Sequence, residues 1–180
     1  SIGNDLILYG RSKDDSLLLQ GWFNNVSNRI GQIKLSQDNS TLYVNPGGGN
    51  GDDQISGSNL DELLMGYNGN DTIYGQEGCD VIQGWRGNDL IYGGDGDDYL
   101  GGDRDNDTLY GGNGCDYLWG GRTGNDVLSG GAGADCYEFR YGSGNDTILA
   151  DSGNWEDNLW LRAGINPYFV GFSQDGGDLQ

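Results

Sequence analysis

The chain has 180 residues, of which 36 are glycine, two are proline and none is histidine. Its 28 acidic and nine basic side chains give a net charge of -19. Such acidity argues against nucleic acid and anionic membrane surfaces as direct partners, and it favours cations, which would relieve the self-repulsion of a compact state. No run of 18 apolar residues is present, so no helix is predicted to span a membrane.

Residues 1–46 precede the regular part of the sequence and are richer in large apolar side chains. Short strands are predicted within residues 4–10, 15–23 and 40–44, where apolar residues cluster between polar and glycine-containing segments. Residues 29–35 are short enough to be either strand or helix.

Residues 47–149 contain eleven near-copies of a nine-residue repeat. GYNGNDTIY (66–74), GQEGCDVIQ (75–83) and GWRGNDLIY (84–92) share Gly at the first and fourth places, Asp at the sixth and Ile at the eighth. The sixth places hold Asp53, Glu62, Asp71, Asp80, Asp89, Asp98, Asp107, Asp116, Asp126, Asp135 and Asp146. The eighth places hold Ile55, Leu64, Ile73, Ile82, Ile91, Leu100, Leu109, Leu118, Leu128, Tyr137 and Ile148.

Each part of the repeat predicts a local structure. The first six residues, rich in Gly, predict a tight turn with positive φ, and the last three predict a very short strand. The middle residue of such a strand faces one side, so the eighth-place residues are predicted to fill a thin core. Two turns and two strands, 18 residues, would form one coil of a flattened parallel solenoid. We therefore predict an all-β fold, a parallel β-roll (right-handed β-helix solenoid) with β-rich capping flanks.

Coils of this kind would stack acids above acids. One edge would carry Asp53, Asp71, Asp89, Asp107 and Asp126, and the other would carry Glu62, Asp80, Asp98, Asp116 and Asp135. Unpaired charges at this spacing repel, whereas a divalent cation between successive turns would reverse the sign of the interaction. Oxygen ligands without His favour Ca²⁺ over Zn²⁺ or copper, and Mg²⁺ suits these turns less well. About one ion for each adjacent pair of turns gives roughly six to nine Ca²⁺ ions.

The repeat resembles the G-G-x-G-x-D-x-U-x nonapeptide of the RTX (repeats-in-toxin, hemolysin-type) proteins, a known calcium-binding pattern. The resemblance implies a calcium β-roll, export by the type I secretion machinery, a secreted or cell-surface location, and folding after export. It also implies that the sixth-place carboxylates and the turn carbonyls bind the ions. The acids so implicated are Asp53, Asp71, Asp80, Asp89, Asp98, Asp107, Asp116, Asp126 and Asp135. The turn residues so implicated are Gly48, Asn50, Gly66, Asn68, Gly75, Glu77, Gly84, Arg86, Gly93, Asp95, Gly111 and Asn113.

Several repeats depart from this pattern. Leu60 and Glu62 weaken the first site of the second edge, and Asp105 replaces a fourth-place Gly. One extra residue near Thr123 is expected to displace a turn, and a two-residue slip before the last copy leaves the assignment of Asp146 open.

Residues 150–180 are again irregular, and strands are predicted within 155–165 and 168–180, the latter with a turn at Asp175–Gly177. RTX toxin blocks often continue their repeats with a flank similar to this one, followed by a stretch similar to residues 1–45. We therefore interpret residues 1–46 as the end of a preceding block, 47–149 as the β-roll and 150–180 as the start of the next flank. Both flanks would act as caps, because solenoid ends expose core.

Aromatic residues and cysteines recur at repeat spacing. Ninth-place Tyr74, Tyr92 and Tyr110 should form a ladder on one face, while Tyr99, Tyr117 and Trp119 should cluster on the other. Either set is cross-strand packing or a platform for a sugar or protein partner. Tyr67 and Trp85 replace second-place Gly and either shield backbone or mark a contact site. Cys79, Cys115 and Cys136 are expected to be free thiols, since the first two lie two coils apart.

The sequence thus predicts a calcium-binding repeat block of an exported bacterial protein, with a toxin as the favoured parent and a host-cell receptor or glycan as a possible partner. A surface adhesin, or an accessory module of a secreted lipase, protease or epimerase, stays open. Catalysis is not expected, because the usual His-dependent nucleophile is missing and the carboxylates follow the repeat.

Overall fold

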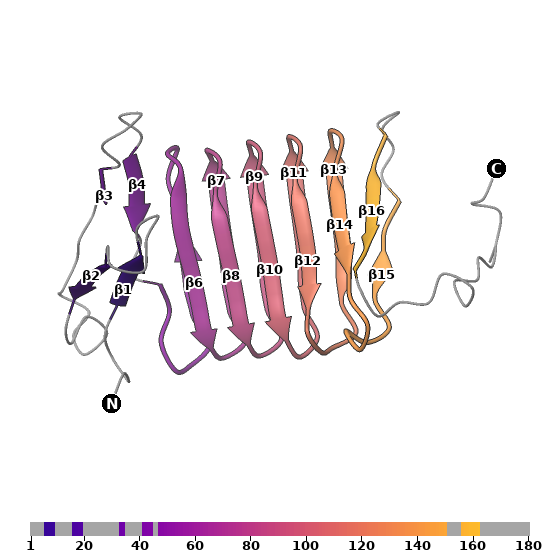
Figure 1. Ribbon diagram of the computed structural model, residues 1–180, viewed down its shortest axis with the longest axis horizontal. Helices are drawn as coiled ribbons and strands as arrows, with labels where there is room; N and C mark the ends of the chain where they lie inside the picture. The colour runs from indigo at the N-terminus through magenta and orange to yellow at the C-terminus, as the bar shows by residue number, and fades with distance from the viewer. Residues whose placement is uncertain are drawn as a thin grey trace.

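The structure is a computed structural model that describes residues 47–150 and 156–162, together with the backbone of four short strands within residues 1–46. In this part of the chain no helix is long and apolar enough to cross a membrane. The regular elements are strands, most of which lie side by side in one long stack (Figure 1).

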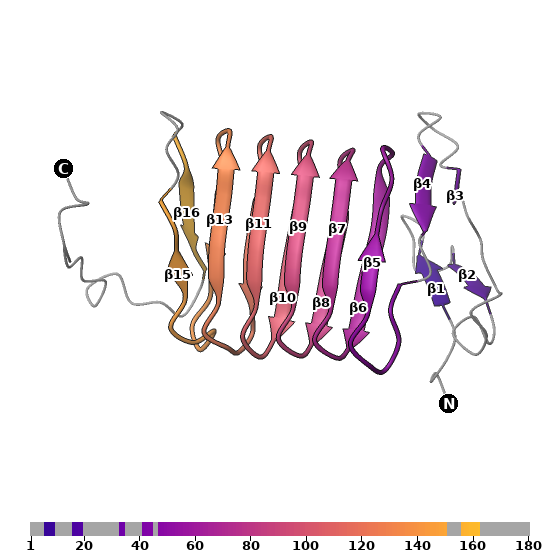
Figure 2. The same ribbon diagram turned by 180° about the vertical axis from the view of Figure 1, so that it is seen from behind.

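Two sheets form the faces of this stack. The eight-stranded sheet, ordered β16-β14-β12-β10-β8-β6-β4-β3, is seen in Figure 1, and the six-stranded sheet, ordered β15-β13-β11-β9-β7-β5, is seen from behind in Figure 2. The first comprises β3 (Ile33–Lys34), β4 (Thr41–Val44), β6 (Glu62–Asn68), β8 (Val81–Arg86), β10 (Tyr99–Arg104), β12 (Tyr117–Gly121), β14 (Cys136–Phe139) and β16 (Asn158–Leu161). The second comprises β5 (Gln54–Ser56), β7 (Thr72–Glu77), β9 (Leu90–Asp95), β11 (Thr108–Asn113), β13 (Val127–Ala132) and β15 (Thr147–Ile148).

The register of the sheets follows the 18-residue period. Ile73 of β7 lies beside Ile91 of β9, and Leu64 of β6 lies beside Ile82 of β8, with each pair of strands parallel. Successive repeats therefore alternate between the two sheets, and every second repeat stacks on its predecessor. The prediction of a parallel β-roll is confirmed.

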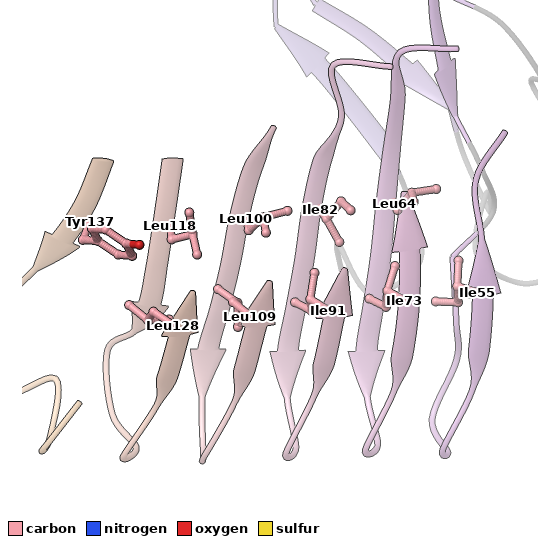
Figure 3. Close-up of a cluster of buried hydrophobic side chains, with 10 residues drawn as sticks. All are labelled: Ile55, Leu64, Ile73, Ile82, Ile91, Leu100, Leu109, Leu118, Leu128 and Tyr137. Carbon is pink, nitrogen blue, oxygen red and sulfur yellow. The ribbon is translucent and has the colours of Figure 1, made fainter. Parts of the chain in front are cut away.

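The core is a double row of eighth-place side chains. Figure 3 shows the two rows facing each other, one from each sheet. The rows consist of Ile55, Leu64, Ile73, Ile82, Ile91, Leu100, Leu109, Leu118, Leu128 and Tyr137, all buried. The eighth-place prediction is confirmed for these ten residues and is wrong for Ile148, which is 42% exposed at the open end of the six-stranded sheet. No further coil covers it among the described residues.

The strands are longer than the sequence predicted, typically six residues instead of three. The strand continues through the first places of the next repeat, so only the following residues form the turn. In β7 the alternation buries Ile73 and then the first-place Gly75. Because strand side chains alternate, the first-place residue points into the roll at its edge, beside the sixth-place carboxylate.

Among the residues that the structure describes, five other than glycine have positive φ, including Gln76 at 91°, at a second place where other repeats carry Gly. A side chain at positive φ costs about 1–2 kcal/mol, and Gln76 is exposed. Replacing Gln76 by Gly should therefore raise the free energy of unfolding by roughly 0.5–1 kcal/mol after the entropic cost of Gly. Chemical denaturation in saturating calcium measures this change, and a clear loss of stability would show that the Gln76 side chain stabilises the fold.

The flanks extend the roll. Strands predicted from residues 4–10, 15–23 and 40–44 appear as β1 (Leu6–Tyr9), β2 (Ser16–Leu19) and β4, and the ambiguous segment 29–35 contains β3. β1 and β2 form a separate antiparallel pair, whereas β4 pairs in parallel with β6. At the other end β16, within the predicted segment 155–165, pairs in parallel with β14. Residues 168–180 lie outside the described part of the chain.

A buried acid attaches β16 to the stack. Glu138 accepts hydrogen bonds from the Tyr117 hydroxyl and from the guanidinium groups of Arg140 and Arg162. Burial alone would raise the pKa of Glu138, but these donors outweigh it and the pKa is lowered. The buried charge is therefore paired on three sides, and Arg162 links the C-terminal flank to the roll.

Candidate metal sites along the edges of the roll

The sixth-place acids lie where the chain leaves a turn and enters a strand. Eight aspartates among them are buried, as is Glu62, with side chains inside the two edges of the roll: Asp71, Asp80, Asp89, Asp98, Asp107, Asp116, Asp126 and Asp135. The first edge contains those of the turns that lead to β7, β9, β11 and β13, and the second contains those that lead to β8, β10, β12 and β14. Asp53 at the N-terminal end is half-buried.

One oxygen of each carboxylate joins neighbouring coils. Oδ1 of Asp89 accepts the backbone N–H of Asp71 at 2.8 Å, and Oδ1 of Asp98 accepts that of Asp80 at 2.8 Å. The same bond joins every successive sixth-place pair along both edges, at N–O distances from 2.8 to 3.1 Å. The acids are thus built into the backbone hydrogen bonding of the roll as well as lining its edges.

The second oxygen of these carboxylates has no hydrogen-bond partner in the interior of the roll. This holds for Oδ2 of Asp71, Asp80, Asp89, Asp98, Asp107, Asp116 and Asp126, each with almost no exposed surface. A buried carboxylate oxygen without a donor costs several kcal/mol, so an acceptor left in this state calls for a ligand.

The unpartnered oxygens face the first-place glycines. A methyl group on Gly75 would lie 2.4 Å from Oδ2 of Asp80 and 2.3 Å from the carbonyl oxygen of Gly93, one coil further on. A methyl group on Gly66 would lie 2.3 Å from Oδ2 of Asp71 and 2.8 Å from the carbonyl oxygen of Gly84. A carboxylate oxygen and a carbonyl oxygen therefore converge beside a bare Cα, the kind of hard oxygen set that suits Ca²⁺.

The predicted ligands are brought together only in part. Among the described residues, no group of three His, Cys, Asp or Glu side chains could hold a metal, so carbonyl oxygens would have to complete each site. First-place Gly48, Gly66, Gly75, Gly84, Gly93 and Gly111 all lie against the sixth-place acid of their own repeat. The third-place carbonyls of Arg86, Asp95 and Asn113 accept N–H groups from the preceding turns of their edges.

The third-place side chains point outward. Asn50, Asn68, Glu77, Arg86, Asp95 and Asn113 are all exposed. Two of their amide groups bridge coils, from Asn68 to Asn50 and from Asn113 to Asp95, both at 2.7 Å. Only their carbonyls are therefore candidates for metal ligation.

The end acids differ from the interior ones. Oδ2 of Asp53 accepts the N–H of Gly49 at 2.7 Å, and both oxygens of Glu62 accept hydrogen bonds from Ser58. Asp146 belongs to the first-edge row, since Oδ1 accepts the N–H of Asp126, but its Oδ2 accepts the Ser143 hydroxyl at 3.0 Å. Polar donors at the ends thus occupy the oxygens that stay without a donor in the interior.

Sequence reasoning missed two features of these edges, a single acid and a ladder of asparagines. Asp157 follows no repeat, yet its Oδ1 accepts the N–H of Asp135 at 3.0 Å and continues the second edge. Fifth-place asparagines form a further ladder outside the first edge, in which Asn70, Asn88 and Asn106 each accept the N–H one coil on. The 18-residue spacing of these asparagines could have revealed this ladder, whereas Asp157 follows an irregular segment and gives no such signal.

Burial raises the pKa of the interior acids in the roll. The pKa is raised to about 7 for Asp80, Asp89 and Asp116, and to about 9 for Asp107, mainly because the charged form is desolvated. The N–H donated by the preceding coil lowers each pKa, and neighbouring acids raise it. Without a cation, these acids therefore bind protons more tightly in the folded roll than in the unfolded chain.

This shift predicts that acid stabilises the calcium-free roll. Since the folded pKa of Asp80 and Asp89 lies above the unfolded value, their contribution to stability is fully present below about pH 4 and is lost as pH rises through about 7. In chelator, far-UV circular dichroism should show more β-structure at pH 5 than at pH 8. A signal that does not change between these values would contradict the burial of ionised acids as the obstacle to folding.

The aromatic ladders are mutually stacked. Tyr74, Tyr92 and Tyr110 stack at centroid distances of 5.1 Å with interplanar angles of 3° and 12°, and Tyr99 stacks on Tyr117 at 4.8 Å. Each inner ring face is covered by the next ring, so this geometry supports cross-strand packing and leaves few free faces for a sugar. Trp119 is buried on the same face as Tyr117, under the guanidinium of Arg140.

Tyr67 and Trp85 lie on neighbouring turns of the first edge with positive φ of 78° and 83°. Their rings are tilted by 30° at 6.3 Å, and Trp85 remains 44% exposed. Shielding of the backbone therefore accounts for only part of the Trp85 surface, because the rest of the side chain stays open to solvent.

Comparison with known proteins agrees with this geometry. A search of curated proteins gives no match. The family model for the RTX calcium-binding nonapeptide repeat matches residues 56–91, 65–100, 92–123, 121–138 and 142–154, which together cover more than half of the chain. These matches include every interior acid whose second oxygen lacks a partner. The chain therefore belongs to the RTX family of calcium-binding nonapeptide repeats.

Proposed function

We propose that this block is a calcium-dependent folding module, in which ions between successive turns convert a repulsive, extended chain into the roll. The observation that carries the proposal is the set of seven buried carboxylate oxygens without a donor along the two edges. Each would be a ligand together with the first-place carbonyl one coil on and other oxygens of the same turns. The ions supply positive charge to edges that otherwise contain only acids at these positions.

Calcium-free folding is opposed by two features of the same residues. The acids of one edge are desolvated, and each faces another acid one coil away, so the ionised rows raise the free energy of the roll. Ligand binding to the folded state alone adds about 2.7 kcal/mol per site at a calcium concentration of about 100 times Kd. Several such sites are enough to reverse the balance for a domain of ordinary stability.

A role for the block in an exported protein is supported by the calcium concentrations at which such sites fill. Calcium sites of extracellular modules have Kd values of about 10⁻⁴–10⁻³ M, so they would stay empty at cytosolic calcium levels and fill outside the cell. An extended, acid-rich chain suits passage through the type I secretion machinery, and folding would follow in the extracellular medium. A secreted toxin is the parent that the flanking segments favour, with the folded block displayed to a host-cell receptor or glycan.

An adhesin or a secreted enzyme with an accessory module would use the same folding device. In an adhesin the roll would serve as a rigid spacer, and in an enzyme it would support export of a separate catalytic domain. We propose no catalytic role for the roll itself, since its carboxylates are accounted for by ladder bonds and metal ligation.

Calcium titration followed by far-UV circular dichroism tests the folding proposal. We expect a cooperative coil-to-β transition in the reduced chain at neutral pH, with little effect of Mg²⁺ at the same concentration. A chain with equal β-structure in excess chelator would contradict the proposal.

A further inference from the structure

Two exposed cysteines occupy equivalent positions on the second edge. Cys79 and Cys115 are both fifth-place residues, in the turns that lead to β8 and β12, and both are free thiols. The coil between them contributes Asp97 at the same place. Their equivalence means that the register of β8, β10 and β12 fixes the separation of the two thiols.

The folded roll keeps these thiols out of disulfide range. β10 lies between β8 and β12, so two strand spacings separate the cysteines, roughly 9–10 Å between Cα atoms. A disulfide needs Cα atoms about 4.4–6.8 Å apart. The backbone is also held at both positions, because Cys79 N–H donates to Asp61 at 2.9 Å and Cys115 N–H donates to Asp97 at 2.8 Å.

The two cysteines do not act as acceptors in the ladder of hydrogen bonds between fifth-place residues. On the first edge, fifth-place Asp and Asn side chains accept the N–H of the next coil in an unbroken series from Asp52 to Asn125. On the second edge, within the described part of the chain, this bond is made by Asp61 and Asp97 only, and a thiol is a weak acceptor. Asparagine at each cysteine would add one such acceptor, so ladder bonding does not account for cysteine there.

We infer that the calcium-loaded roll and a Cys79–Cys115 disulfide exclude each other, which makes the block sensitive to the order of calcium binding and oxidation. In the extended chain the two thiols are joined by a flexible segment and can meet, since closing a loop of this length costs little more than closing a short one. Two thiols and one oxidised glutathione then give one disulfide and two reduced glutathiones. If calcium binds first, the folded roll holds the two thiols apart. If oxidation comes first, the disulfide prevents the coils between the two cysteines from forming.

This inference rests on the proposed calcium-dependent folding, and the test separates the two. The 180-residue chain with Cys136→Ser is treated with oxidised glutathione either in chelator or in saturating calcium. Intact mass and N-ethylmaleimide labelling then report the intramolecular disulfide, and calcium-titrated circular dichroism reports folding. We expect the disulfide in chelator only, a calcium midpoint raised about tenfold or more in the oxidised chain, and recovery with dithiothreitol.

The control carries Cys79→Asn and Cys115→Asn in the same background. It should fold at the calcium midpoint of the reduced chain or below it, before and after oxidation, because the added acceptors extend the ladder. The inference is overturned if the disulfide forms equally in saturating calcium with the β signal intact, or if the oxidised chain folds at the reduced midpoint. Failure of the reduced chain to fold with calcium would instead contradict the proposed function.

Discussion

Replacing Asp89 and Asp98 by Asn is expected to change stability in opposite directions with and without calcium. Asn keeps an oxygen that can accept the N–H of Asp71 or Asp80, but it removes the buried charge and the unpartnered Oδ2. In chelator each substitution should stabilise the roll by about 2–4 kcal/mol at pH 8, since an ionised buried acid is removed. In saturating calcium each should remove about 3 kcal/mol with the lost site.

Circular dichroism with calcium titration and calorimetric calcium counting measure both effects. The matched control is Asp97→Asn, the same substitution at the exposed neighbour of Asp98, where the oxygen that accepts Cys115 N–H is retained. Asp97→Asn should leave the number of bound ions unchanged. An unchanged ion count in the Asp89 and Asp98 variants would show that these acids are not ligands.

Replacing Gly93 by Ala is expected to abolish one site and to destabilise the calcium-loaded roll severely. The added methyl group would lie 2.3 Å from Oδ2 of Asp98 and 2.6 Å from the carbonyl oxygen of Gly111. These are the two oxygens proposed to share an ion, so the methyl group would displace the ion as well as strain the edge. We expect a loss of several kcal/mol, in the range of the largest single substitutions, about 4–5 kcal/mol.

Gly51→Ala is the control for this substitution. A methyl group on Gly51 meets no atom within 4 Å, so the variant should be stabilised by about 0.4–1 kcal/mol through the unfolded state. Thermal unfolding in calcium compares the two variants directly. Equal midpoints for the Gly51 and Gly93 variants would be incompatible with a crowded oxygen site at the first place.

The sequence predicted the roll because its nine-residue period places the same type of residue at each structurally equivalent position. An aliphatic residue every nine positions defines a core side chain per strand, and 18-residue stacking follows from the alternation of two strands, as Ile73 beside Ile91 shows. The stacking of the sixth-place acids along the two edges was predicted for the same reason. Glu62 and Asp146, whose repeats depart from the pattern, also differ from the interior acids in the hydrogen bonds that their oxygens accept.

The features that the sequence did not predict depend on which partners the backbone groups have in the folded chain. The first-place Gly75 is buried because β7 extends through it. The Gly-rich sequence of this segment does not reveal that the strand continues there. The pattern shows only that acids stack, and it does not reveal that Oδ1 of each acid accepts the N–H of the coil before it. Asp157 and Glu138 act across gaps of more than 20 residues without any period, so no repeat analysis could find them.

A crystal structure in saturating calcium, with ions located by anomalous scattering, tests the central claim most directly. The account predicts an ion at Oδ2 of each interior acid from Asp71 to Asp126, bonded also to carbonyl oxygens of adjacent turns, with Oδ1 still accepting the N–H of the coil before it. Ions bound elsewhere, or a folded roll whose interior Oδ2 atoms carry no ion, would contradict it.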